Sequence, residues 1–297
     1  MTPADRPGAR LCDLLAEGPL ILPGVFNAIT ALQAQACGHA ALYLSGAGVT
    51  NALIGSPDVA LLTLTEMAQQ ARYVARAVDV PVIADADTGY GEALNVARCV
   101  EEFEHAGLAG LHLEDQVAPK RCGHLDGKQV IPAADMAAKL RAAAKARRDD
   151  SFLIIARTDA RGVTGLADAI ERGKRYLDAG ADLLFPEGLE SRAEFAAYAD
   201  AMPDGTWLLA NMTEFGKTPY LTADEFAALG YRMVIFPMTA FRAMLFTARD
   251  VYATLRETGT QSLLLNRMQT RAELYELVRY TNYEAFDREA AGEPPPP

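Results

Sequence analysis

PVIADADTGYGEALNVARCVEEFEHAGLAGLHLED (residues 81–115) indicates the fold of this chain most directly. It begins with a short apolar run, continues with a segment of helical period over 93–107, and ends with a second apolar run. Buried parallel strands have this composition, and a helix that joins two of them makes a β-α-β unit. Both runs end in acidic residues, which are Asp85 and Asp87 in the first run and Glu114 in the second.

The same alternation extends in both directions along the chain. Eight apolar runs are predicted strands: LILPGVF (20–26), ALYLSG (41–46), PVIADAD (81–87), GLAGLHLED (107–115), FLIIARTD (152–159), LLFPEG (183–188), WLLANM (207–212) and MVIFPM (233–238). Segments of helical period lie between them, at 64–78, 93–107, 133–147 and 165–180. An unbroken series of eight such units predicts an α/β fold, a (β/α)8 TIM barrel with extra C-terminal helices, in preference to a doubly wound open sheet.

The length of 297 residues suits one barrel domain that spans 1–297. After Gly259, a short apolar patch leads into a polar, helix-prone segment. We therefore expect a C-terminal helical extension over 262–289. The proline-rich end, 290–297, is predicted to be a disordered tail.

Charge and composition exclude several classes of protein. The net charge of −11 argues against a nucleic-acid partner, because such proteins usually present a basic face. No apolar run is long enough to span a membrane, and the first residues lack the apolar region of a secretory signal. Four cysteines without paired spacing (Cys12, Cys37, Cys99 and Cys122) favour a reducing, cytoplasmic location.

Acidic residues at two predicted strand ends indicate a metal site. In a TIM barrel, reactive residues gather at the carboxyl ends of the strands. Asp85 and Asp87 are two positions apart, so on a strand they would face the same side, with Glu114 on the next strand. An oxygen-only cluster favours Mg²⁺, or alternatively Mn²⁺, over zinc, with substrate and water completing the shell. The alternative is a set of solvated acids with no ligand.

Arginines near other strand ends point to an acidic substrate. Arg157 and Arg242 follow well-separated strands, and Arg271 lies beyond the barrel. Arginine binds carboxylate in a bidentate fork, although each of these three could instead form a structural ion pair. With Asn211 and Thr213 as further donors, the set predicts a small di- or tricarboxylate.

The segment 116–132 is long for a connection between a strand and a helix. It contains Lys120-Arg121-Cys122-Gly123-His124, in which one thiol lies among two permanent cations and an imidazole. Such neighbours lower the pKa of a thiol and favour the thiolate. We interpret the segment as a lid that brings Cys122 to the substrate, with Gly123 and Gly127 as possible hinges. A basic surface loop that happens to hold a cysteine is the alternative.

The motifs DADTGYG, LHLEDQ, KRCGH and ARTDA, in this order, resemble the isocitrate lyase/phosphoenolpyruvate mutase superfamily. Farther along, LLFPE, LANMTEFGKTP, FPMTAFRAM and MQTRAELYELVRY are similar to its methylisocitrate lyase family in particular. The resemblance extends from about Leu22 to Tyr283. It implies Mg²⁺-dependent cleavage of 2-methylisocitrate to pyruvate and succinate in propionate degradation (the 2-methylcitrate cycle). It also implies a homotetramer with exchanged C-terminal helices.

The resemblance also assigns roles to individual residues of this sequence. Asp85 and Asp87 would hold the metal. The implied catalytic residues are Cys122 as the acid, Tyr43 as the base, Glu114 and His124. The implied substrate-binding residues are Ser45, Gly46, Ala47, Cys122, Gly123, Arg157, Glu187, Asn211, Met212, Thr213, Arg242 and Arg271.

Two departures from the family pattern leave the substrate open. Leu125 follows His124 where the family has arginine, and Ala47 interrupts a glycine triplet. The alternative is therefore a related lyase or hydrolase that acts on 2,3-dimethylmalate, isocitrate or oxaloacetate, although Phe185 would leave room for the extra methyl group. Two further readings are weaker: a dinucleotide enzyme, because the glycine pattern of SGAGVTN (45–51) is incomplete, and a barrel that binds carboxylates without catalysis.

Overall fold

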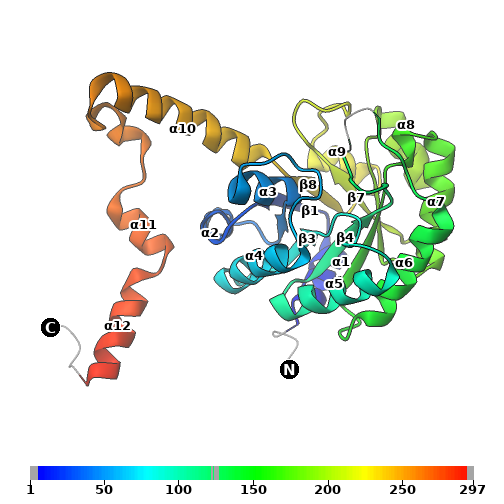
Figure 1. The fold of residues 1–297 in the computed structure, drawn as a ribbon, viewed down its shortest axis with the longest axis horizontal. Coiled ribbons are helices and arrows are strands. Elements are labelled where there is room, and N and C mark those ends of the chain that lie inside the picture. The colour runs from blue at the N-terminus through cyan, green and yellow to red at the C-terminus, as the bar shows by residue number, and fades with distance from the viewer. Residues whose placement is uncertain (1–5, 122, 124–126, 293–297) are drawn as a thin grey trace. The chain divides into compact units, whose positions relative to one another are not determined.

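The computed structural model describes residues 6–121, 123 and 127–292 (Figure 1). The predictions for Cys122, His124 and Leu125 therefore lie outside the described residues. The chain forms two compact units, Met1–Phe241 and Arg242–Pro297, which are treated separately below.

The first unit is a closed barrel of eight strands in chain order. The strands are β1 (Leu20–Val25), β2 (Leu42–Leu44), β3 (Val82–Asp85), β4 (Gly110–Glu114), β5 (Leu153–Thr158), β6 (Leu183–Pro186), β7 (Trp207–Asn211) and β8 (Met233–Phe236). Every neighbouring pair is parallel, and β1 pairs with β8 to close the ring. This confirms the predicted (β/α)8 barrel, because each predicted strand contains the observed one.

Helices follow the strands and surround them on the outside (Figure 1). They are α1 (Pro7–Glu17), α2 (Ala28–Ala36), α3 (Gly46–Ile54), α4 (Leu64–Ala77), α5 (Ala93–Ala106), α6 (Ala133–Ala146), the 3-10 helix η2 (Ala160–Gly162), α7 (Leu166–Asp178), α8 (Arg192–Asp200) and α9 (Ala223–Ala228). Local sequence signals set their ends. Thr63 and Glu66 form a capping box at the start of α4, and Gly107, with φ +95°, ends α5.

The apolar core has two parts. One lies between the strands and the outer helices, and the other fills the inside of the barrel with residues such as Ile83, Ile155 and Leu209. Leu11 and Leu15 of α1 belong to the inner part, together with residues at the starts of the strands. Helix α1 therefore packs against the amino-terminal end of the barrel.

The second unit contains most of α10 (Thr239–Thr258), followed by the 3-10 helix η3 (Ser262–Arg267), α11 (Arg271–Leu277) and α12 (Tyr280–Ala291). Helices therefore occupy the predicted extension over 262–289. The compact unit already begins at Arg242, however, and α12 continues to Ala291, past the predicted boundary at 289. Residues 293–297 of the predicted tail lie outside the described chain. Among the described helices, none combines the length and apolar composition that a membrane crossing requires.

Candidate active site

The inner core ends in a layer of polar side chains at the carboxyl ends of the strands. Side chains alternate along a strand, so the residue two positions beyond an interior residue faces the interior again. Four strands follow this rule: Asp85 comes after Ile83, Arg157 after Ile155, Glu187 after Phe185, and Asn211 after Leu209. On β4, His112 lies opposite Asp85, and Glu114 lies opposite Arg157. The fold therefore brings together most of the predicted site residues.

The two predicted metal carboxylates lie together, but for a reason other than the predicted one. Strand β3 ends at Asp85, and Asp87 has φ +47°, so the two do not share one face of a strand. Instead, the backbone N–H of Asp87 donates to Asp85 Oδ1 at 2.9 Å. The Nζ of Lys120 lies 2.9 Å from Asp87 Oδ1 and 2.6 Å from Asp58 Oδ1. In the sequence, Lys120 stands out only as a neighbour of the thiol, and no pattern singles out Asp58.

Burial and charge separate the pKa values of this acidic group. Burial alone would raise the pKa of Asp85, but His112, Lys120 and Arg157 lower it to about 2. Burial, together with Asp85 and Asp58, raises the pKa of Asp87 to about 6, although Lys120 opposes this. Four nearby carboxylates raise the pKa of Lys120 well above its ordinary value and outweigh its burial. Lys120 is therefore a cation that partly neutralises the acidic group.

Tyr43 and His112 form a buried pair beside Asp85. The hydroxyl of Tyr43 lies 2.9 Å from His112 Nε2 and donates to Asp85 Oδ2 at 3.4 Å. Burial lowers the pKa of His112 to about 4 and raises the pKa of Tyr43 well above its ordinary value. Both groups are therefore neutral near pH 7, and they are linked by a hydrogen bond.

Arg157 connects three carboxylates. Its Nη1 lies 3.0 Å from Glu114 Oε2, its Nε donates to Asp159 Oδ2 at 3.0 Å, and its Nε lies 3.9 Å from Glu187 Oε2. The Nδ2 of Asn211 donates to both oxygens of Glu187, at 3.1 and 3.2 Å. Glu114 is fully buried, and burial raises its pKa well above the ordinary value although Arg157 opposes this.

The amino terminus of α3 points into the same layer. Ser45 is buried and caps the helix by accepting a hydrogen bond from the N–H of Gly48 at 3.1 Å. A Cβ at Gly46 would lie 2.6 Å from Asp85 Oδ2, so the helix can approach this carboxylate because residue 46 is glycine. Gly46 and Ala47 occupy the first turn of this helix, a position whose free N–H groups are suited to an anion.

The carboxylates of this layer match the donors that Mg²⁺ prefers. The part of the chain that the structure describes holds no group of three His, Cys, Asp or Glu side chains placed to bind a metal ion. Mg²⁺ usually keeps several waters and takes one or two protein carboxylates. Within the described residues, both Glu114 oxygens are buried; Oε2 forms the ion pair with Arg157, and Oε1 has no hydrogen-bond partner. Asp85 and Asp87, with Glu114 as an acceptor for bound water, therefore fit the ion.

The described part of the 116–132 segment lies against this layer. Gln116 exchanges two hydrogen bonds with the backbone of Arg121, at 2.8 and 2.9 Å. A Cβ at Gly123 would lie 2.4 Å from Glu187 Cγ and 2.8 Å from Arg157 Nη2. The backbone at Gly123 therefore touches the Arg157–Glu187 pair directly. The predicted catalytic residues Cys122 and His124 lie outside the described residues.

Met212, Thr213, Arg242 and Arg271 are also predicted to bind the substrate. The side chain of Met212 packs in the outer core, and its N–H donates to the carbonyl of Ile235 at 2.9 Å. Thr213 follows it and is partly exposed. Arg242 and Arg271 belong to the second compact unit, so their roles in binding stay a prediction.

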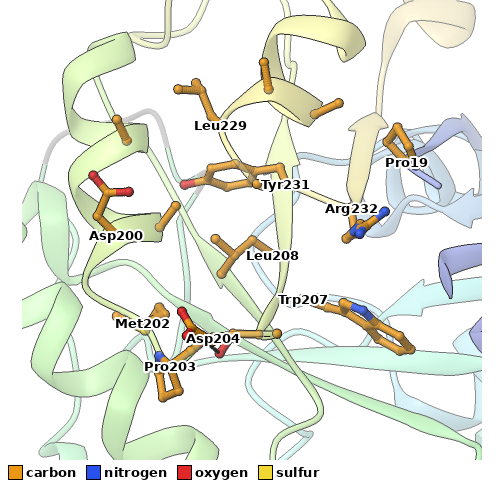
Figure 2. Close-up of a pocket in the computed structure, with 17 residues that line it drawn as sticks. Pro19, Asp200, Met202, Pro203, Asp204, Trp207, Leu208, Leu229, Tyr231 and Arg232 are labelled. Carbon is orange, nitrogen blue, oxygen red and sulfur yellow. Dashed lines mark hydrogen bonds between the residues drawn. The ribbon is translucent and has the colours of Figure 1, made fainter.

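Two cavities lie at different ends of the barrel. One of about 680 Å³ is lined by Pro19, Trp207 and Arg232, which stand at the starts of strands (Figure 2). Another, of about 550 Å³, is lined by Asp87, Tyr90 and other residues next to the acidic group. The cavity in Figure 2 is thus at the end of the barrel that is associated with stability, and the other is at the catalytic end.

A closed parallel barrel with paired carboxylates, an arginine hub and a helix amino terminus at one end is typical of an enzyme. The model of the phosphoenolpyruvate phosphomutase family matches residues 11–256. The chain belongs to this family, which confirms the resemblance found in the sequence. It is 50% identical to the 2-methylisocitrate lyase of Aeropyrum pernix over 97% of this chain and 92% of the relative. Identity to the 2-methylisocitrate lyase of Escherichia coli is 45%, over 91% of each chain.

Solved structures agree with this membership. Oxaloacetate acetylhydrolase in complex with 3,3-difluorooxaloacetate is 34% identical, with a TM-score of 0.91 over 98% of both chains. The 2,3-dimethylmalate lyase, in its trigonal crystal form, is also 34% identical, with a TM-score of 0.91 over 98% of this chain and 96% of that one. Phosphonopyruvate hydrolase in complex with oxalate and Mg²⁺ is 28% identical, with a TM-score of 0.84 over 95% and 98% of the chains.

Proposed function

We propose that this protein is a Mg²⁺-dependent carbon–carbon lyase of the cytoplasm that cleaves 2-methylisocitrate to pyruvate and succinate. The observation that carries the proposal is the meeting of Asp85, Asp87, the amino terminus of α3 and the Arg157–Glu187 pair in one layer. Relatives named 2-methylisocitrate lyase or probable 2-methylisocitrate lyase, 41–51% identical to this chain, support the substrate. Phosphonopyruvate hydrolase, with its Mg²⁺, supports the metal.

The residues of the layer suit the two ends of such a substrate. Mg²⁺ held by Asp85 and Asp87, partly through water, would supply a Lewis acid that polarises the 2-hydroxy acid. The N–H groups of Gly46 and Ala47 bind the carboxylate that becomes part of pyruvate. Arg157 provides a fixed cation toward the other carboxylates, while Glu187 and Asn211 hold its surroundings in place.

The bond cleavage needs one proton to leave and another to arrive. Tyr43 is a neutral phenol, so it accepts the proton of the substrate hydroxyl as it passes its own proton to His112 Nε2, which lies 2.9 Å from the phenol oxygen. The carbon–carbon bond then breaks, the hydroxyl-bearing carbon becomes the keto carbon of pyruvate, and the electron pair moves to the succinate fragment. Cys122 delivers a proton to that carbon, and His124 is the further catalytic residue that the family resemblance implies.

A direct test is pyruvate release from four candidate substrates, with and without Mg²⁺. We expect 2-methylisocitrate to give the highest kcat/KM, and excess EDTA to abolish turnover. The second candidate function is that of a related enzyme acting on 2,3-dimethylmalate, isocitrate or oxaloacetate, and the two structures at a TM-score of 0.91 support it. A higher kcat/KM with one of these three, or turnover that persists in EDTA, would contradict the first proposal.

We also propose that the protein is a homotetramer in which C-terminal helices are exchanged between subunits. Between residues 242 and 292, Leu264 alone is buried. Large apolar side chains of this unit are exposed, including Phe246, Tyr252, Tyr283 and Phe286. Exposure of this many large apolar side chains in one unit is typical of an interface between subunits.

A further inference from the structure

Lys128 is a buried lysine to which the proposed chemistry assigns no role. Its side chain is 3% exposed, and its Nζ donates to Asp159 Oδ1 at 2.8 Å. The same Nζ donates to the carbonyl oxygen of Gly123. One cation thus joins two groups that belong to different segments, namely the end of β5 and the described part of 116–132.

Both partners of Lys128 touch the reaction layer. Asp159 is fully buried and accepts hydrogen bonds from the Nε and Nη2 of Arg157, at 3.0 and 3.3 Å. The backbone at Gly123 lies so close to Glu187 and Arg157 that a Cβ there would overlap both. Asp159 therefore pairs with two cations. Arg157 belongs to the proposed substrate site, and Lys128 holds the backbone of Gly123 next to that site.

A rigid base supports this arrangement. The N–H of Asp159 donates to Asp115 Oδ1 at 2.8 Å, and Asp115 Oδ2 accepts from Thr158 at 2.7 Å and from Tyr176 at 2.8 Å. The Nη1 of Arg172 lies 3.1 Å from the same Asp115 oxygen. A buried, fully bonded carboxylate network of this kind fixes its members in one geometry.

We propose that Lys128 is a positioning residue: it holds the Gly123 backbone against the Arg157–Glu187 pair through the carboxylate that also orients Arg157. The inference rests on the proposed function for its kinetic test, because Gly123 and Arg157 belong to the substrate site. A misplacement of about 1 Å in such a site costs about 100-fold in rate. Lys128 acts on the transition state through Gly123 and Arg157, and so affects kcat more than KM.

The test compares Lys128→Met, Lys128→Arg and Gly123→Ala with the wild type. We expect Lys128→Met to lose about 100-fold in kcat with KM nearly unchanged, and Lys128→Arg to recover most of the loss because it keeps the cation. Gly123→Ala moves the same backbone by steric overlap and is expected to lose kcat similarly. If Lys128→Met and Gly123→Ala act through the same contact, the fold-loss in kcat of the double variant is far smaller than the product of the two single fold-losses.

A second measurement does not depend on the substrate. Amide hydrogen exchange over residues 116–132 is expected to be faster in Lys128→Met than in wild type, since the segment loses an anchor. This result separates the inference from the proposed function, because a chain that cleaves none of the four substrates still gives an exchange rate. If Lys128→Met does not fold, exchange and kcat in Gly123→Ala and Lys128→Arg decide the matter.

Arg147→Met is the matched control. Arg147 also joins a backbone carbonyl, that of Phe152 at 3.0 Å, to a carboxylate, that of Asp182, but at the opposite end of the barrel. We expect this variant to keep the wild-type kcat and the wild-type exchange over 116–132. Wild-type kcat in either Lys128→Met or Gly123→Ala, equal losses in Arg147→Met, or failure of Lys128→Arg to recover activity would overturn the proposal.

Discussion

Gly46 illustrates how a missing side chain can shape a site. Its backbone begins α3 beside Asp85, where a Cβ would stand 2.6 Å from a carboxylate oxygen. The N–H groups of the helix can therefore approach both the metal carboxylate and an anionic substrate.

The Gly46→Ala substitution should disturb this approach. Forcing a methyl group into a filled space costs about 1–3 kcal/mol, and here Asp85 or the start of α3 has to move. We expect kcat/KM for pyruvate release to fall at least about tenfold. The Mg²⁺ concentration needed for half-maximal activity should rise, because the carboxylate of Asp85 is displaced. Gly18→Ala is the control, since it has extended backbone and no atom within 4 Å of the new Cβ, and should behave as wild type.

His112 makes stability depend on pH in a defined window. Its folded pKa of about 4 lies below the ordinary 6.5, so between these values the unfolded chain binds more protons. The His112 contribution is fully present above pH 6.5 and is lost as the pH falls toward 4, by up to about 3 kcal/mol. Asp87, with its pKa raised from 3.8 to about 6, acts in the opposite direction over much of this window.

Comparison with His112→Gln isolates the histidine contribution, because Asp87 is present in both proteins. We expect the difference in unfolding free energy, wild type minus variant, to decrease steadily from pH 6.5 to pH 4. Urea unfolding in EDTA at several pH values measures it. A difference that is constant over this range would show that the folded pKa of His112 is not lowered.

The position of a site residue could be predicted from the sequence where it lies at the end of a predicted strand. Asp85, Glu114, Arg157 and Asn211 interrupt or end apolar runs, and the barrel rule places such residues together. His112 was missed as a site residue because a single histidine within an apolar run carries no signal of its partner. Asp58 lies in the connection between α3 and α4. A loop has no helical or strand periodicity from which the direction of its side chains could be predicted.

At the scale of elements, α1 forms part of the barrel core although it precedes all eight strands. Leu11 and Leu15 are fully buried in the same cluster as the inward-facing strand residues. The apolar pattern of strands and helices gave no reason to place this helix, because which end of the barrel it covers depends on tertiary packing.

Truncation of Leu15 measures this contribution. Leu15→Ala should lower the free energy of unfolding by about 2–5 kcal/mol, the cost of a cavity in a packed core. Leu94→Ala, at an 88% exposed position in α5, is the control and should change it by less than about 0.5 kcal/mol. Denaturant titration of both variants tests the difference, and equal values would mean that α1 does not pack as described.

The ranges of strands and helices could be predicted from the sequence because, in a barrel, buried strands are continuous apolar runs and the outer helices have apolar residues at helical spacing. The observed α4, α5 and α6 lie within one residue of the predicted ranges. The turn after β3 did not follow, because Asp87 and Tyr90 adopt positive φ values of 47° and 59°. Tertiary contacts hold such non-glycine residues in the left-handed region, and local pattern does not reveal them.

At the scale of the whole molecule, the exposed apolar side chains of the second unit make assembly testable. We expect light scattering after size exclusion to give the mass of four chains for the wild type. Replacing both Tyr283 and Phe286 in α12 by Glu should reduce this mass, because each side chain is more than 70% exposed and would place a charge in the interface. Asn282→Glu with Thr281→Glu on the same helix provides the charge-matched control.

A monomeric wild type, or an unchanged mass in the Tyr283 and Phe286 variant, would contradict the tetramer with exchanged helices. The same samples can be assayed for pyruvate release. Arg242 and Arg271 belong to the unit that assembly would cover. Activity that falls with the loss of mass would support their predicted roles in substrate binding.

The single tryptophan of the chain, Trp207 (Figure 2), begins β7, and Asn211 ends it in the polar layer. At about 3.3 Å per residue, the indole and the reaction layer are about 13 Å apart along the strand. The fluorescence of this indole therefore reports unfolding at the amino-terminal end of the barrel. Its intensity should change little when a carboxylic acid binds at the carboxyl end. A fluorescent reporter of occupancy has to be engineered at the other rim.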